Sequence, residues 1–161
     1  MPLTLESDLS TLLSDLLATQ GELLEILNRK RECLGSADIH GLAALDAEEG
    51  RLAGALQECL RRREELLARA GEEGRPSTSI QDLVTALPKA QTSPLRKQVD
   101  LASARARLLK HQSLTNWVII QRTLLHLSQL LEIIATGGQL QPTYGDKGQS
   151  SSGGVLVDWA A

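Results

Sequence analysis

Histidine and cysteine are the residue types in this chain best suited to bind a metal or act as a nucleophile, and it holds three His and two Cys. Metal sites in helical bundles use inward carboxylates and Glu-x-x-His pairs, which place two ligands one helical turn apart. His40, His111 and His126 follow Ala37, Leu108 and Thr123 by three positions, so no such pair exists. We therefore expect solvent-facing or helix-edge histidines and no metal site.

Catalytic and nucleotide-binding motifs are also missing from the sequence. It contains no G-x-S-x-G, no Walker A and no G-x-G-x-x-G pattern. We expect no catalytic residue, no cofactor and no enzyme activity.

The two cysteines, Cys33 and Cys59, are far apart in the antiparallel arrangement predicted below. Cys33 would lie near the turn of the hairpin, and at about 1.5 Å of rise per residue Cys59 would lie roughly 30 Å along the helix from it. This distance is far beyond the ~7 Å between Cα atoms that a disulfide can bridge. We predict free, buried thiols, which are typical of a reducing, cytoplasmic compartment.

The net charge of −3 gives no general attraction to nucleic acid or to an acidic membrane. Basic residues cluster in the last predicted helix: Arg96, Lys97, Arg105, Arg107 and Lys110. This cluster is either a nucleic-acid-binding patch or a solvated helix face that complements the acidic first helix. The solvated face is favoured because no aromatic residues are interleaved for base stacking. The longest purely apolar run is WVII at 117–120, so neither a signal peptide nor a membrane insertion is predicted.

Leu and Ala dominate the apolar residues, Phe is absent, and apolar positions recur in seven-residue repeats. These features predict an all-α fold, an elongated antiparallel bundle of three long helices and one short helix. The predicted helices cover about 4–34, 37–70, 79–87 and 94–136, and together they form a bundle domain over 1–136. Gly35 is the expected stop of the first helix, Ser36 the N-cap of the second, and Ser93 and Pro94 the start of the last.

Five of the polar residues at heptad positions would lie buried between the helices. We expect them to fix the register of the helices rather than to do chemistry; they are Gln20, Glu49, Arg63, Ser113 and Asn116.

The last helix is the longest, at roughly 65 Å against about 50 Å for each of the first two. Part of it must overhang the hairpin, kink, or pair with another surface. Trp117 in its middle is either a packing residue or part of an exposed apolar patch.

The segment 137–161 is rich in Gly and Ser and predicts a flexible tether with an apolar end, VLVDWAA. Tyr144 and Trp159, two of only three aromatic residues, lie in it. They either fold back onto the bundle or bind a partner, and we favour the partner because Tyr and Trp are common interaction anchors.

The stretch LTNWVIIQRTLLHLSQLLEIIATGG at 114–138, followed by PTYGDKG at 142–148, resembles the FlgN family of flagellar export chaperones. The resemblance covers roughly residues 114–161. It implies a cytoplasmic, non-enzymatic, all-α protein that binds hook-associated proteins at the hook–filament junction, prevents their premature assembly and delivers them to the export apparatus.

The same resemblance suggests roles for individual residues. Tyr144 matches the tail tyrosine of the family and would dock at the export gate or its ATPase complex, with Leu156 and Trp159 as further tail contacts. An amphipathic client helix would lie on exposed positions of the last helix: Asn116, Trp117, Ile120, Leu124, Leu127, Leu131 and Ile134. The chain would be a monomer or a weak dimer. The alternative is a coiled-coil adaptor that self-associates through the same heptads.

Overall fold

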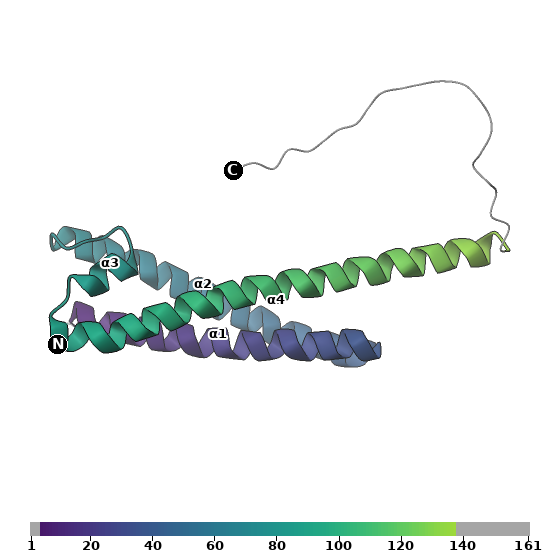
Figure 1. Ribbon diagram of the computed structural model, residues 1–161, viewed down its shortest axis with the longest axis horizontal. Helices are drawn as coiled ribbons and strands as arrows, with labels where there is room; N and C mark the ends of the chain where they lie inside the picture. The colour runs from purple at the N-terminus through teal and green to yellow at the C-terminus, as the bar shows by residue number, and fades with distance from the viewer. Residues whose placement is uncertain (1–3, 138–161) are drawn as a thin grey trace, which may run out of the picture. The chain divides into compact units, whose positions relative to one another are not determined.

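The computed structural model describes residues 4–137, without the side chains of 89–93, and each secondary-structure element in this part is an α-helix (Figure 1). This confirms the predicted all-α helical bundle. The helices are α1 (Leu5–Ser36), α2 (Ile39–Glu72), α3 (Ile80–Thr85) and α4 (Lys89–Ala135).

The turn between α1 and α2 is formed by Ala37 and Asp38. Ala37 takes a left-handed conformation (φ 55°) at the C-cap of α1, and Asp38 caps α2 by accepting a 2.8 Å hydrogen bond from the Gly41 N–H. The expected stop at Gly35 and N-cap at Ser36 were therefore wrong by two residues. The aspartate is the stronger competitor for the cap because its carboxylate also suits the positive end of the helix dipole.

Ion pairs along α1 and α2 follow an antiparallel order. Arg69 pairs with Asp8 at 2.6 Å, Arg62 with Asp15 at 2.6 Å, and Arg51 of α2 with Glu22 at 3.1 Å. The partner on α1 moves toward the C-terminus as the partner on α2 moves toward the N-terminus, as antiparallel helices require.

These pairs correct one interpretation of the basic cluster. The acids on α1 pair with basic residues of α2 and of the turn after it, whereas the side chains of Arg96, Lys97, Arg107 and Lys110 are exposed and have no hydrogen bond or ion pair within residues 4–137. Only Arg105 reaches α1, where it donates to the carbonyl of Leu17 at 2.6 Å. The cluster is a solvated face, but it does not neutralise the acidic helix.

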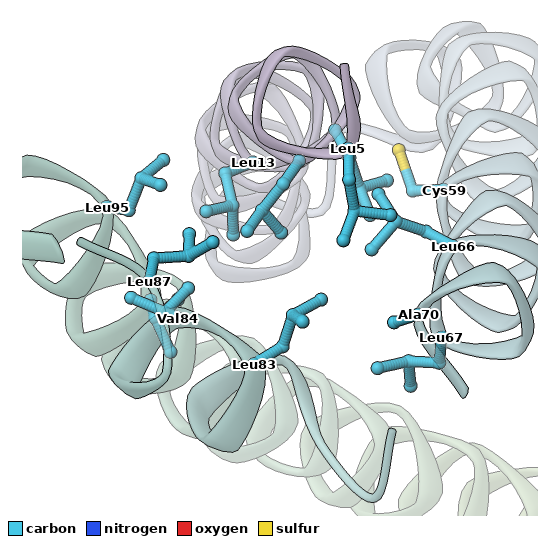
Figure 2. Close-up of a cluster of buried hydrophobic side chains, with 13 residues drawn as sticks. Leu5, Leu13, Cys59, Leu66, Leu67, Ala70, Leu83, Val84, Leu87 and Leu95 are labelled. Atoms are coloured by element: carbon cyan, nitrogen blue, oxygen red, sulfur yellow. The ribbon is translucent and has the colours of Figure 1, made fainter. Parts of the chain in front are cut away.

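The main core gathers side chains from all four helices. Figure 2 shows Leu83 and Val84 of α3 facing Leu5 and Leu13 of α1 and Leu66 of α2 across one interior. Leu83 and Val84 are almost fully buried. The short helix therefore packs onto the bundle as the sequence predicted, with Ser79 as its N-cap.

The start of α4 differs from the prediction. The helix begins at Lys89, so Ser93 and Pro94 lie inside it rather than at its first positions. Lys89, Ala90 and Gln91 are good helix formers, and they extend the helix upstream of a proline that was expected to open it.

The chain divides into two compact units, residues 1–123 and residues 124–161. The first unit contains α1, α2, α3 and most of α4, and the described part of the second is the end of α4. The predicted tail 137–161 lies outside the described residues apart from Gly137, which has φ +64°. Its separation from a bundle domain at 136 stays a prediction.

Candidate functional site

Histidine and cysteine form no reactive centre in the part of the chain that the structure describes. His40, His111 and His126 are exposed, and Cys33 and Cys59 are free thiols. Within the described residues no group of three or more His, Cys, Asp or Glu side chains could hold a metal ion. Cys59 is buried and Cys33 half-buried; burial raises the pKa of the Cys59 thiol, which makes it a poor nucleophile at neutral pH.

Two polar heptad residues join α1 to α4 and α1 to α2. Gln20 of α1 is 3% exposed and donates from Nε2 to the carbonyl of Ala102 at 3.0 Å. Glu49 of α2 pairs with Lys30 of α1. Burial opposes the charge of Lys30, but the hydrogen bond and charge of Glu49 outweigh it and raise the pKa of the ammonium. These contacts fix helix register, as the sequence suggested.

Asn116 is the polar heptad residue that was also placed in the client-binding set. It is 4% exposed, its Nδ2 donates to the Leu27 carbonyl at 2.9 Å, and its Oδ1 accepts from Nε of Arg31 at 3.2 Å. Its hydrogen-bonding groups are used inside the first unit. A client cannot reach this amide without opening the bundle, so we leave Asn116 out of the proposed surface.

Trp117 and Ile120 are the members of the predicted set that lie on α4 in the first unit. Trp117 is 57% exposed and Ile120 half-buried. Of the two readings of Trp117, the structure supports an exposed apolar residue rather than a core residue.

The remaining members of the predicted set lie in the second unit. Every residue described there is exposed; the predicted members are Leu124, Leu127, Leu131 (65%) and Ile134 (75%). Their steps of three, four and seven place them on one face of the helix. We call the four residues Leu124, Leu127, Leu131 and Ile134 the α4 stripe.

Sequence reasoning missed three further exposed side chains of the second unit, Leu125, Leu130 and Ile133. Leu125 and Ile133 lie on another face of α4 than Leu131, so this segment is apolar on more than one side. A helix that is apolar all round is normally buried. That composition was the available signal, and it indicates a surface that a partner covers.

One window of α4 is also apolar enough for a membrane span by length and composition alone. Its mean hydropathy is 1.3 over 18 residues, and none of it is buried. The described C-terminal part of the helix carries Arg122 and Glu132 among its apolar residues. The high hydropathy of this window reflects the same exposed apolar side chains described above.

The three predicted tail residues, Tyr144, Leu156 and Trp159, lie outside the described residues. Their roles stay predictions.

Comparison with protein-family models gives a match over most of the chain. The model of the family described as FlgN protein matches residues 1–152, which is most of the chain and includes all four helices. No curated protein and no solved structure matches.

Proposed function

We propose, since the chain belongs to the FlgN family of flagellar export chaperones, that it captures hook-associated proteins on the α4 stripe and delivers them to the flagellar export apparatus. The family is a chaperone family and not an enzyme family, and its members are soluble cytoplasmic proteins. The single observation that carries the assignment of the stripe is the run of uncovered leucines and isoleucines in the second unit.

The chemistry of the stripe suits a helical client. Residues at i, i+3, i+4 and i+7 on an exposed helix form the complement of another amphipathic helix. Covering the four stripe residues of the second unit would contribute roughly 6–12 kcal/mol in gross apolar burial. Association costs about 4–15 kcal/mol before any affinity appears. Because these two ranges overlap, the stripe alone supports weak, reversible binding. A client bound in this way can be released without ATP hydrolysis.

A charge placed in the stripe should abolish client binding. We expect Leu131→Glu to weaken affinity for a hook-associated protein from the same genome at least tenfold, because the carboxylate would be desolvated in the complex. Isothermal titration with purified proteins gives the measurement.

Gln129→Glu is the matched control for this variant. Gln129 is exposed, lies two residues away and faces another side of the same helix. We expect it to bind the client within about twofold of wild type. Equal losses in both variants, or no loss in either, would refute the stripe as the client site.

Tyr144 is the proposed docking residue for the export apparatus. The proposal rests on its match to the family's tail tyrosine and on the preference of tyrosine for protein interfaces. We expect Tyr144→Ala to retain client affinity in titration and to lose binding to the isolated export-gate component in a pull-down, with Tyr144→Phe as the milder variant. Loss of client binding instead would place Tyr144 in the cargo site. Leu156 and Trp159 are proposed as additional tail contacts, to be substituted in the same assay.

Self-association is the alternative for the same apolar surface. A coiled-coil adaptor would bury the stripe against a second copy, whereas the chaperone would be a monomer or weak dimer when free. The mass of the free protein by light scattering separates them. A stable oligomer that shows no affinity for hook-associated proteins would favour the adaptor.

A further inference from the structure

A cavity of about 490 Å³ lies within the first unit between α1, α2, α4 and the start of α3. Its volume is in the range of roughly 300–1,000 Å³ that is usual for small-molecule pockets. The lining is mainly apolar. Leu12, Leu13 and Val99 are buried core residues beneath it, whereas Leu60 and Ala106 are exposed, so the cavity opens to solvent. We call it the bundle cavity.

Gln20 brings an unpartnered hydrogen-bond acceptor to this cavity. The side chain lines it, is 3% exposed and donates from Nε2 to the Ala102 carbonyl at 3.0 Å. Its Oε1 is buried and accepts no hydrogen bond within residues 4–137. A buried acceptor that has lost water and gained no donor destabilises the folded state. A ligand that donates a hydrogen bond to this oxygen is therefore favoured over one that is apolar throughout.

Arg63 of α2 brings a positive charge to the same cavity. It is half-buried and has no hydrogen bond or ion pair within the described residues, whereas Arg61, Arg62 and Arg69 of the same helix each pair with a carboxylate. A guanidinium binds a carboxylate through two parallel hydrogen bonds. The unpaired charge therefore favours an acidic ligand.

The register of α1 and α2 sets the spacing between these two polar groups. The ion pair of Asp15 with Arg62 places both residues at about the same level of the antiparallel helices. Gln20 lies five residues beyond Asp15 on α1, and Arg63 lies one residue beyond Arg62 on α2, in the opposite direction along the bundle. At about 1.5 Å of rise per residue, Gln20 and Arg63 are separated by roughly 9 Å along the bundle.

We propose that the bundle cavity binds a small amphipathic acid, with a carboxylate against Arg63, an extended apolar chain along the core side chains and a hydroxyl that donates to Oε1 of Gln20. The site shares no residue with the α4 stripe and does not depend on the chaperone function proposed above. A medium-chain ω-hydroxy fatty acid has these three parts at this spacing, and ω-hydroxyoctanoate is the probe. Octanoate lacks the hydroxyl and octanol lacks the carboxylate, so they are the comparison ligands.

Titration of the full-length protein with the three ligands measures what each polar group contributes. We expect ω-hydroxyoctanoate to bind several-fold more tightly than octanoate, because its hydroxyl satisfies Gln20. Octanol should bind at least fivefold more weakly than octanoate, because it leaves Arg63 without an anion. Gln20→Leu should remove the preference for the hydroxyl, so that the two acids bind within twofold of each other. This ratio compares two ligands on one variant, so a change in the variant's stability does not alter it.

Substitution of Arg63 tests the charge. We expect Arg63→Gln to weaken the binding of ω-hydroxyoctanoate at least fivefold and Arg63→Lys to retain most of the affinity. Arg107→Gln is the matched control, because Arg107 is exposed on α4, lies outside the cavity and has no ion pair within residues 4–137. It should bind within twofold of wild type. Far-UV circular dichroism and urea midpoints verify that the variants fold as the wild type does.

Cys59 reports where the probe binds. Its side chain lines the cavity, whereas Cys33 lies outside it. We expect saturating ω-hydroxyoctanoate to slow alkylation of Cys59 by N-ethylmaleimide at least fivefold and to change the rate at Cys33 by less than twofold. Peptide mapping by mass spectrometry measures both rates.

Other modes of binding give different outcomes. Loss of binding in Leu131→Glu, together with full binding in Arg63→Gln, would mean that the acid binds the α4 stripe. Equal affinities of the three ligands, or equal protection of Cys59 and Cys33, would mean unspecific apolar association. No binding of ω-hydroxyoctanoate at millimolar concentration would show that the cavity does not take such an acid. Each of these results overturns the proposal, and none of them refutes client capture on the α4 stripe.

Discussion

Asn116 shows how a polar residue at a heptad position acts in this bundle. One side chain joins the Leu27 carbonyl and the Arg31 guanidinium, with an amide that is almost fully buried. Such a residue specifies one alignment of α4 against α1, because any shift in register leaves a buried amide unpaired.

Removal of this amide should destabilise the protein. We expect Asn116→Ala to lower the free energy of unfolding by about 1–3 kcal/mol, since the buried Leu27 carbonyl loses its donor and the half-buried Arg31 loses its acceptor. Ser113→Ala, at an exposed position one turn earlier, should change it by less than about 0.5 kcal/mol. Urea unfolding followed by circular dichroism measures both. Equal stability losses would show that Asn116 does not hold the register.

The sequence predicted which polar residues have a structural role, but it did not predict which residues they contact. The heptad pattern marked Gln20, Glu49 and Asn116 as structural, and each makes a contact between helices. It also placed Asn116 on the client surface and expected Ser113 at the interface, where the structure has it exposed. The partners of Gln20 and Asn116 lie 82 and 89 residues away in the chain, and a seven-residue period does not encode that alignment.

At the scale of elements, the existence and type of all four helices followed from Leu and Ala periodicity and from capping residues. The start of α1, the N-cap Ser79 of α3 and the end of α4 also came within one residue of the prediction, but two other boundaries did not. Asp38 displaced Ser36 as the N-cap, and α4 began five residues before Pro94, because local competition between caps and helix formers decides such ends.

The part of α4 in the second unit should be the least stable helical segment. Its side chains are exposed from Leu124 to Ile134, so its hydrogen bonds lack the tertiary packing that stabilises most protein helices. We expect amide hydrogens of residues 124–135 to exchange orders of magnitude faster than those around Ala102, which packs in the first unit. Hydrogen exchange with mass spectrometry of the free protein measures this. Equal protection along α4 would indicate that another surface already covers the segment.

At the scale of the whole molecule, the chain belongs to the FlgN family of flagellar export chaperones, and the described end of α4 is uncovered apolar surface. Capture of a client on the α4 stripe, as proposed above, would be reversible because apolar burial there is comparable to the cost of association.

Hydrogen exchange of residues 124–135, measured with and without a purified hook-associated protein, shows whether a client covers the α4 stripe. Burial of the α4 stripe under a client helix should slow exchange in this segment at least tenfold, and the Leu131→Glu variant should show no such slowing at the same concentrations. A complex that forms with full affinity but leaves exchange in residues 124–135 unchanged would show that the client binds elsewhere than on the α4 stripe.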